Sequence, residues 1–253
     1  MSLLHEIYYV AWGDFRYMRH TFKNILISSL VTPILYLLAF GYGINGGAVT
    51  VEGVTVPYLD FVIPGIIALT TLSASFSATS ARLNVQRLYY RCFDELMMCP
   101  LSCSAIVIGK AVIGVVRGVL SAGLMFIIGY VLEPSFLHLT PLFVISLLVA
   151  CFTFSFLGVS AALLAKSHAS MATFSSLVIT PMTFLCGTFF SVANLPVWAQ
   201  GALYVLPLTE ASVCIRSATL DIYAFPFWAL GVLCMFMIAF FLLDYYLVRY
   251  RKI

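Results

Sequence analysis

The chain has 253 residues, of which 62% are hydrophobic and only 9% are charged, whereas soluble globular domains carry about 25% charged residues. A soluble fold of this length could not bury so much apolar surface, so the composition excludes an ordinary soluble enzyme and a disordered chain. The net charge of +3 gives no sign of a nucleic-acid partner. The sequence therefore predicts one all-α, polytopic membrane domain over residues 1–253.

Residues 1–24 form the first predicted element, an amphipathic helix. Its apolar residues recur every three or four positions and share one helical face, whereas Asp14 and most other polar residues fall on the opposite face. The helix is too polar to span a bilayer, so we expect it to lie in the membrane interface, with Trp12 and Phe15 in the headgroup boundary. The alternative is a solvated leader. The apolar residues are Leu4, Ile7, Ala11, Trp12, Phe15, Met18 and Phe22.

Six long apolar runs follow, and each is long enough to cross a bilayer as a helix. Prolines at positions 33, 64 and 181 lie inside three of them and are interpreted as kinks rather than breaks, because neighbouring helices can satisfy the freed carbonyl groups. The predicted spans are residues 25–44, 58–80, 105–132, 141–165, 170–190 and 227–248.

Basic residues are distributed very unevenly between the two sets of loops. Arg117 is left out of this count because it lies within a span. The loops at 45–57, 133–140 and 191–225 carry only Arg216. The two termini and the other loops carry the remaining lysines and arginines, at positions 16, 19, 23, 82, 87, 91, 110, 166, 249, 251 and 252. Because cytoplasmic loops are rich in Lys and Arg, both termini and residues 82–103 are predicted to be cytoplasmic. Residues 45–57, 133–140 and 191–225 are then on the outer side. The expected location is the cytoplasmic (inner) membrane of a bacterium or archaeon.

Arg117 is the one cation buried in a predicted span, since Lys110 lies near the cytoplasmic start of the same run. A charge within the membrane indicates a functional site by default, and a role in a pore is one interpretation. The other is that the side chain snorkels to the cytoplasmic face or forms a structural pair. On the same helix, Gly114 and Gly118 form a G-x-x-x-G pattern that favours close helix packing.

Residues 82–103 form a patterned cytoplasmic loop that predicts an amphipathic helix ending at Pro100. Such a helix could lie on lipid headgroups, or it could insert into a groove on a soluble partner. Asp94 and Glu95 favour a protein partner, because anionic side chains gain nothing from an anionic leaflet. Both interpretations remain open on composition alone.

Residues 191–225 are too apolar for a free loop and too interrupted for a span. Leu195, Pro196 and Trp198 lie in a short first helix that ends before Pro207. A second helix is predicted to begin with Thr209 as N-cap and Glu210 in the first turn, and it carries Arg216. Two short helices with their ends on one side predict an outer re-entrant hairpin beside a vestibule or gate. Two helices lying flat in the interface are the alternative.

The sequence predicts no catalytic, cofactor or metal site. The four histidines form no cluster, and the cysteines lack metal-ligand spacing. The chain also lacks the G-x-x-x-x-G-K-[ST] pattern of an ATPase, since Gly109-Lys110 is followed by Ala111.

Several motifs in order along the chain resemble the permease subunits of type-2 ATP-binding-cassette exporters, especially the branch of nodulation lipooligosaccharide and daunorubicin-type exporters. Cys186-Gly187 departs from the Ser-Gly that is frequent in relatives. The matching segments are Thr32-Pro33 with Phe40-Gly41-Tyr42-Gly43, Phe61-Val-Ile-Pro64-Gly65, Phe93-Asp94-Glu95-Leu96 with Pro100-Leu101-Ser102, Pro181 to Phe190, Leu195-Pro196-x-Trp198, and Leu206-Pro207-Leu208-Thr209-Glu210 with Arg216.

The resemblance implies six spans, an interfacial connecting helix at 1–24, a coupling helix in 82–103 and the outer hairpin at 191–225. It also implies a homodimer or pseudo-dimer with two ATPase subunits, which would bind the ATP and Mg²⁺. The coupling segment is expected at Tyr89–Met97, where Phe93 and Leu96 would be apolar anchors and Asp94 and Glu95 would provide charge complementarity. Tyr90 and Arg91 belong to the same expected surface.

Three functions are compatible with the sequence. The favoured one is a permease that exports an amphiphile, such as a lipid-linked glycan, a glycolipid or a hydrophobic drug, using a separate ATPase. A secondary transporter would be expected to show inverted repeats and ionisable groups at the midplane. A membrane-embedded acyl or glycosyl transferase would need a cluster of carboxylates or histidines, which the sequence does not place together.

Overall fold

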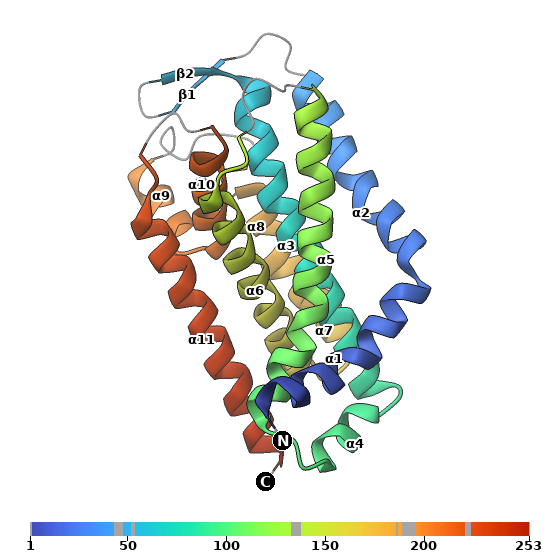
Figure 1. Cartoon of the computed structure of the whole chain (residues 1–253). Helices are drawn as coiled ribbons and strands as arrows, with labels where there is room; N and C mark the ends of the chain where they lie inside the picture. The colour runs from blue at the N-terminus through green and yellow to red at the C-terminus, as the bar shows by residue number, and fades with distance from the viewer. Residues whose placement is uncertain are drawn as a thin grey trace.

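The computed structural model describes residues 2–42, 48–51, 54–132, 138–185, 187–188, 196–220 and 224–252. The described chain is helical apart from one small β-hairpin (Figure 1). Its elements in chain order are α1 Leu3–His20, α2 Phe22–Tyr36, the π-helical η1 Leu37–Tyr42, β1 Ala48–Val51, β2 Val54–Pro57, α3 Tyr58–Leu88, α4 Cys92–Met98, α5 Cys103–Leu132, α6 Pro141–Leu164, α7 His168–Phe174, the π-helical η2 Ser175–Ile179, α8 Thr180–Leu185, α9 Val197–Tyr204, α10 Pro207–Leu220 and α11 Phe227–Lys252.

Four helices of the described chain are long and apolar enough to cross a membrane, namely α3, α5, α6 and α11. This confirms an all-α membrane protein, whereas the count of six spans stays a prediction. The other two predicted spans are divided into shorter pieces, because η1 follows α2 and η2 separates α7 from α8. Each π-helical piece lies near a proline, Pro33 or Pro181, that lacks the N–H needed for a regular helical bond. By contrast, α3 continues through Pro64 without a break.

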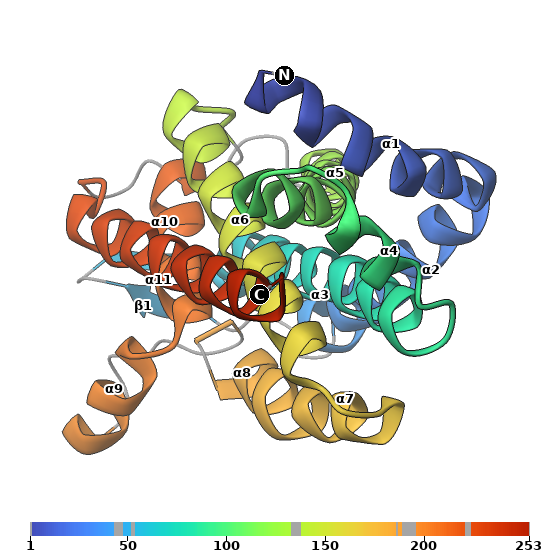
Figure 2. The ribbon, with the colours of Figure 1, turned by 90° about the horizontal axis from the view of Figure 1, so that it is seen from below.

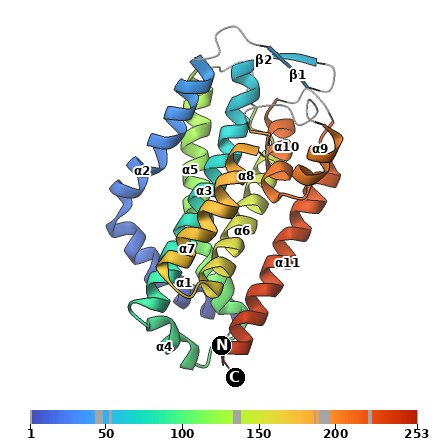
Figure 3. The same cartoon turned by 180° about the vertical axis from the view of Figure 1, so that it is seen from behind.

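The long helices run side by side, and the two ends of the bundle differ in what they carry (Figure 1). Both termini, α1 and α4 lie at one end. The β1–β2 hairpin, α9 and the end of α10 lie at the other end, as the reverse view also shows (Figure 3). The hairpin pairs Ala48 with Pro57 and Val51 with Val54 in antiparallel register, and it was not predicted from the sequence.

The helix α3 is at the centre of the packing and is buried along most of its length. It contacts α5, α6 and α10. Figure 2 shows α1 beside α5, whereas α7 and α8 lie on the opposite side of α3. One apolar cluster fills the middle and outer part of the bundle around Phe61, Phe154 and Ile215. A second, smaller cluster around Leu83, Phe93 and Val248 closes the end that carries α4.

The predicted glycine contact in α5 is confirmed. A Cβ atom at Gly114 would overlap the hydroxyl groups of Thr79 and Ser155, and one at Gly118 would overlap the hydroxyl of Ser75. Only glycine lets α5 approach α3 and α6 this closely. The pattern therefore determines how the central helices pack.

Candidate functional site

The predicted coupling segment is a turn followed by a short helix. The helix α3 continues to Leu88, and α4 begins only at Cys92, so the expected helix start at Tyr89 is wrong by three residues. Arg91 adopts a left-handed backbone conformation with φ of 55°. This conformation is uncommon for residues other than glycine, and it reverses the chain between α3 and α4.

Phe93 has a different role from the one expected. Its side chain is 2% exposed and packs in the cluster with Leu83, Ile106 and Val248. Leu96 is partly buried against the same cluster. These two side chains attach α4 to its own bundle, so Phe93 is not an anchor for a partner. The alternation of apolar and charged residues in α4 could not distinguish these two uses.

The exposed side of this segment forms a continuous surface, here called the α4 surface, that consists of Tyr89, Tyr90, Arg91, Asp94, Glu95 and Met98. Tyr89 and Met98 are 74% and 86% exposed. The rings of Tyr89 and Tyr90 meet edge to face with centroids 5.0 Å apart. Tyrosine, methionine and arginine are enriched in protein-binding surfaces, and the two carboxylates disfavour binding to anionic headgroups.

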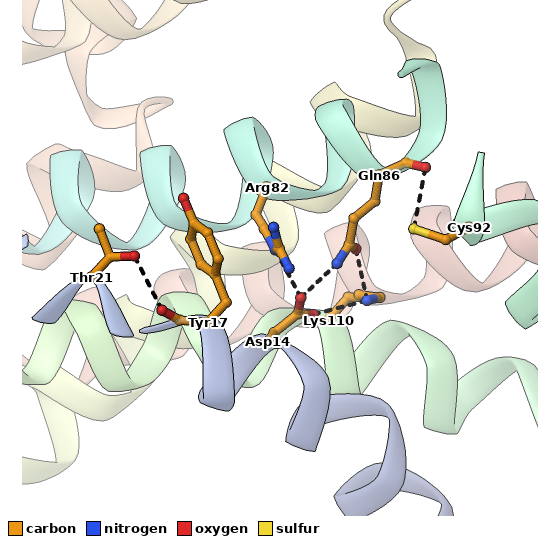
Figure 4. A network of polar contacts seen from close by, with 7 residues as sticks. All are labelled: Asp14, Tyr17, Thr21, Arg82, Gln86, Cys92 and Lys110. Carbon is orange, nitrogen blue, oxygen red and sulfur yellow. Dashed lines mark hydrogen bonds and ion pairs between the residues drawn. The ribbon is translucent and has the colours of Figure 1, made fainter. Parts of the chain in front are cut away.

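A buried polar network joins α1, α3 and α5 close to α4 (Figure 4). Asp14 of α1 is 1% exposed and is the only acidic group in it. One carboxylate oxygen lies 2.8 Å from Lys110 Nζ, and the other lies 3.1 Å from Arg82 Nε. The Gln86 amide donates to Asp14 over 2.6 Å and accepts from Lys110 over 2.8 Å. Because each side of the Gln86 amide has a matching partner, the network orients all three helices.

The network extends toward α4 and along α1. The Cys92 thiol of α4 donates to the backbone carbonyl of Gln86 over 3.7 Å. The Arg82 guanidinium lies 4.0 Å from the centroid of the Tyr17 ring. At the start of α1, Glu6 accepts hydrogen bonds from the backbone and hydroxyl of Ser102 at 3.0 and 2.6 Å. The connecting helix is thus fixed to both sides of the α4 segment.

The close approach of α1 to α5 depends on a glycine. A Cβ atom at Gly109 would lie 2.7 Å from the Cβ of Val10, closer than real Cβ contacts. Val10 is buried at this contact. Since Lys110 follows Gly109 directly, the backbone contact and the ion pair with Asp14 form at one point of α5.

Sequence reasoning missed the network because it placed Asp14 on the solvated face of α1. A signal was available: Lys110 lies near the start of the apolar run 105–132, and a cation that becomes buried there requires an anionic partner. The sequence contains few carboxylates on the predicted cytoplasmic side, and Asp14 is one of them.

The predicted outer hairpin consists of α9 and α10 within the described chain. Leu195 lies outside the described residues, as does the side chain of Trp198, whereas Pro196 precedes α9 and is exposed. The predicted N-cap at Thr209 is wrong. The helix begins at Pro207, which suits a first helical position, and the Thr209 hydroxyl donates to the Leu203 carbonyl over 2.7 Å.

Arg216 and Glu210 are both buried in α10, which packs against α3, α6 and α11. Arg216 donates to the carbonyls of Phe61 and Gly187 at 3.3 and 3.1 Å, and its guanidinium lies 3.8 Å from the centroid of the Phe61 ring. Both carboxylate oxygens of Glu210 are buried without a hydrogen-bond partner among the described residues. The arrangement makes Arg216 a clamp between α10, α3 and the segment after α8.

Two further features lie within the bundle. Arg117 is partly buried midway along α5, and its Nε atom has no hydrogen-bond partner in the described chain, so both interpretations of this residue stay open. A cleft of about 340 Å³ lies between α3 and the α7–η2 segment. Asn84 contributes to its wall with an amide that is 1% exposed and has no partner among the described residues. The remaining lining residues are Phe76, Ser77, Ser80, Ala81, Val85, His168, Met171, Ala172 and Ser175.

Comparison with known proteins gives a consistent result over most of the chain. The family profile described as ABC-2 type transporter matches residues 5–220. The inner membrane transport permease YadH of Escherichia coli strain K12 is 26% identical over 235 residues, which cover 91% of each chain. Nodulation protein J of Rhizobium leguminosarum bv. viciae is 29% identical over 235 residues, 89% of this chain and 87% of the relative. Nodulation protein J of Sinorhizobium fredii is 28% identical over 204 residues, 78% of this chain and 74% of the relative.

Proposed function

Because the chain belongs to the ABC-2 type transporter family, we propose that it is the membrane-spanning subunit of an ATP-driven exporter. A separate ATPase with two copies would bind ATP and Mg²⁺ and supply the energy. The observation that carries this proposal is the α4 surface, which is exposed although α4 itself is fixed to the bundle by Phe93. A partner that pushes on such a helix moves α3 and α5 with it.

The transmission of force would follow the buried network. Displacement of α4 acts on the turn after α3 and on the segment before α5, which α1 holds together through Asp14 and Glu6. Because packed helices move as rigid units, the movement would reach the cleft that contains Asn84. The connecting helix would serve as a brace that keeps α3 and α5 in register.

The proposed orientation places α1, α4 and both termini in the cytoplasm. Its support is the basic-residue bias together with the position of both termini at the α4 end (Figure 1). Single-cysteine labelling in a cysteine-free background tests it, with Tyr90→Cys as the probe, since this side chain is exposed in the segment between α3 and α4. Labelling of that cysteine from outside intact cells would exclude the orientation.

The substrate is proposed to be an amphiphile, such as a lipid-linked glycan, a glycolipid or a hydrophobic drug. The α3–α7 cleft supports this, because a mostly apolar wall also carries the unpartnered amide of Asn84. One copy of the chain encloses too little space for such a pathway, so two copies are proposed to face each other, with α2 and α7–α8 near the seam. The hairpin of α9 and α10 would then form the outer gate.

ATP hydrolysis by the reconstituted complex tests the assignment of the α4 surface. Glu95→Lys should lower partner binding and stimulated hydrolysis at least tenfold, because charge complementarity determines docking register. Leu139→Lys is the matched control, since it adds a lysine at an exposed position at the other end of the bundle. Equal hydrolysis by both variants and the wild type would exclude docking at α4. It would favour the alternatives of a secondary transporter or a membrane-embedded transferase.

A further inference from the structure

An apolar groove of about 260 Å³ lies between the connecting helix α1 and the span α5. Tyr8, Trp12 and Phe15 line it from α1, and Val112 and Val116 line it from α5. The three aromatic side chains remain about half exposed. The groove therefore has room for an extended hydrocarbon chain beside aromatic rings that are otherwise uncovered in this chain.

A basic hollow of about 400 Å³ lies farther along α1 than the groove, and Arg16, Arg19 and His20 line it. Trp12, Arg16 and Arg19 are spaced by four and three residues, so they form one stripe along the helix. The structure describes no ion pair or hydrogen bond from the Arg16 or Arg19 side chain. Two exposed guanidinium groups are thus continuous with the apolar groove.

The buried network on the opposite face of α1 adds positive charge near Arg16 and Arg19. Asp14 is its only carboxylate, and Arg82 and Lys110 both contact it, so the network retains one net positive charge. The surface around Arg16 and Arg19 consequently attracts anions rather than zwitterions.

We propose that the groove and the basic hollow together bind one anionic phospholipid. The two guanidinium groups would hold the phosphate, for which their planar, multiple donors are well suited, and an acyl chain would occupy the groove. The order of residues along α5 agrees with this arrangement. Gly109 and Lys110 contact α1, and Val112 and Val116 follow them on α5, farther from the end of the bundle that carries α4. The proposal rests on the proposed orientation, which puts α1 at the inner leaflet.

An acidic side chain of the ATPase could also bind the two arginines. It would leave the aromatic groove unfilled, so the combination of charge and groove favours a lipid. The bound lipid would complete the packing between α1 and α5 next to the Asp14 network. Occupancy is therefore expected to stabilise the position of the connecting helix.

Native mass spectrometry tests the site. The full chain is released from detergent in the presence of equimolar dioleoyl phosphatidylglycerol and dioleoyl phosphatidylcholine. The wild type should retain phosphatidylglycerol preferentially. Arg16→Gln/Arg19→Gln should weaken phosphatidylglycerol binding at least about tenfold and leave phosphatidylcholine binding unchanged, because a charged hydrogen-bonding pair is lost. Arg249→Gln/Arg251→Gln removes the same charge from the C-terminal tail and should preserve the preference.

Equal retention of both lipids by the wild type would overturn the proposal. So would a loss of preference in the tail variant but not in the α1 variant.

A second measurement does not require arginine variants. In proteoliposomes, dibrominated phosphatidylglycerol should quench the Trp12 fluorescence more than dibrominated phosphatidylcholine does at equal content, with Trp12→Phe defining the contribution of the other two tryptophans. Equal quenching by both lipids would exclude a bound anionic lipid at α1. Both experiments use the chain without its ATPase, so a failed hydrolysis test would leave them unaffected.

Discussion

Asp14→Asn should release the connecting helix from the bundle. The substitution removes the one carboxylate that neutralises Lys110, whose side chain is 9% exposed, and Arg82, whose side chain is 24% exposed. Loss of one partner from a buried ion pair costs about 3–5 kcal/mol, and we assign most of this to Lys110 because the more exposed Arg82 can be solvated. The cost falls on the contact between α1 and α5.

Hydrogen–deuterium exchange of residues 3–20 in nanodiscs measures this opening. Since about 1.4 kcal/mol corresponds to a tenfold change, exchange in α1 should accelerate at least about 100-fold, while α6 and α11 stay protected. Lys110→Met in the Asp14→Asn background removes the unpaired cation and should restore most of the protection. Asp94→Asn is the control, because it neutralises an exposed carboxylate. Unchanged exchange of α1 in Asp14→Asn would refute the structural role of the network.

Two further substitutions test the packing around α1 and α4. Gly109→Val should displace α1 and accelerate its hydrogen–deuterium exchange, because the new side chain would meet Val10. Gly123→Val on the same helix should have little effect, since its Cβ position is open. Equal effects of the two substitutions would contradict the assigned contact. Phe93→Ala should destabilise the chain by about 3–5 kcal/mol in unfolding assays in detergent, because it empties a buried aromatic site. Tyr90→Ala should cost much less, since that ring is 62% exposed, and similar losses for both would show that Phe93 is not part of the core.

The long spans could be predicted from the sequence because hydropathy and length are sufficient to identify a helix in lipid. The close packing of α5 could be predicted as well, since Gly114 and Gly118 specify it locally. The burial of Asp14 could not, because a helical wheel shows which residues share a face but not which face meets another helix. Whether Phe93 would face the bundle or a partner was undetermined for the same reason.

Local signals also failed where two of them competed. Thr209 and Glu210 form a plausible helix start, but Pro207 provides an earlier one. The Thr209 hydroxyl donates a hydrogen bond to the Leu203 carbonyl instead of capping the helix. After α3, the apolar periodicity continues across residues 89–91, whereas α3 ends at Leu88 and the left-handed Arg91 separates it from α4. Backbone reversal at a residue other than glycine leaves no clear pattern in a sequence.

Photo-crosslinking at Met98 tests the central claim most directly, because this side chain is 86% exposed, more than Tyr89 or Tyr90 of the same α4 surface. A benzophenone amino acid at position 98 should form an adduct with an ATP-binding-cassette ATPase in native membranes, and the yield should change between ATP and ADP. The same probe at Leu139, exposed at the other end of the bundle, should not form it. Adducts of position 98 with lipid alone, or an ATPase adduct from position 139 instead, would contradict the account.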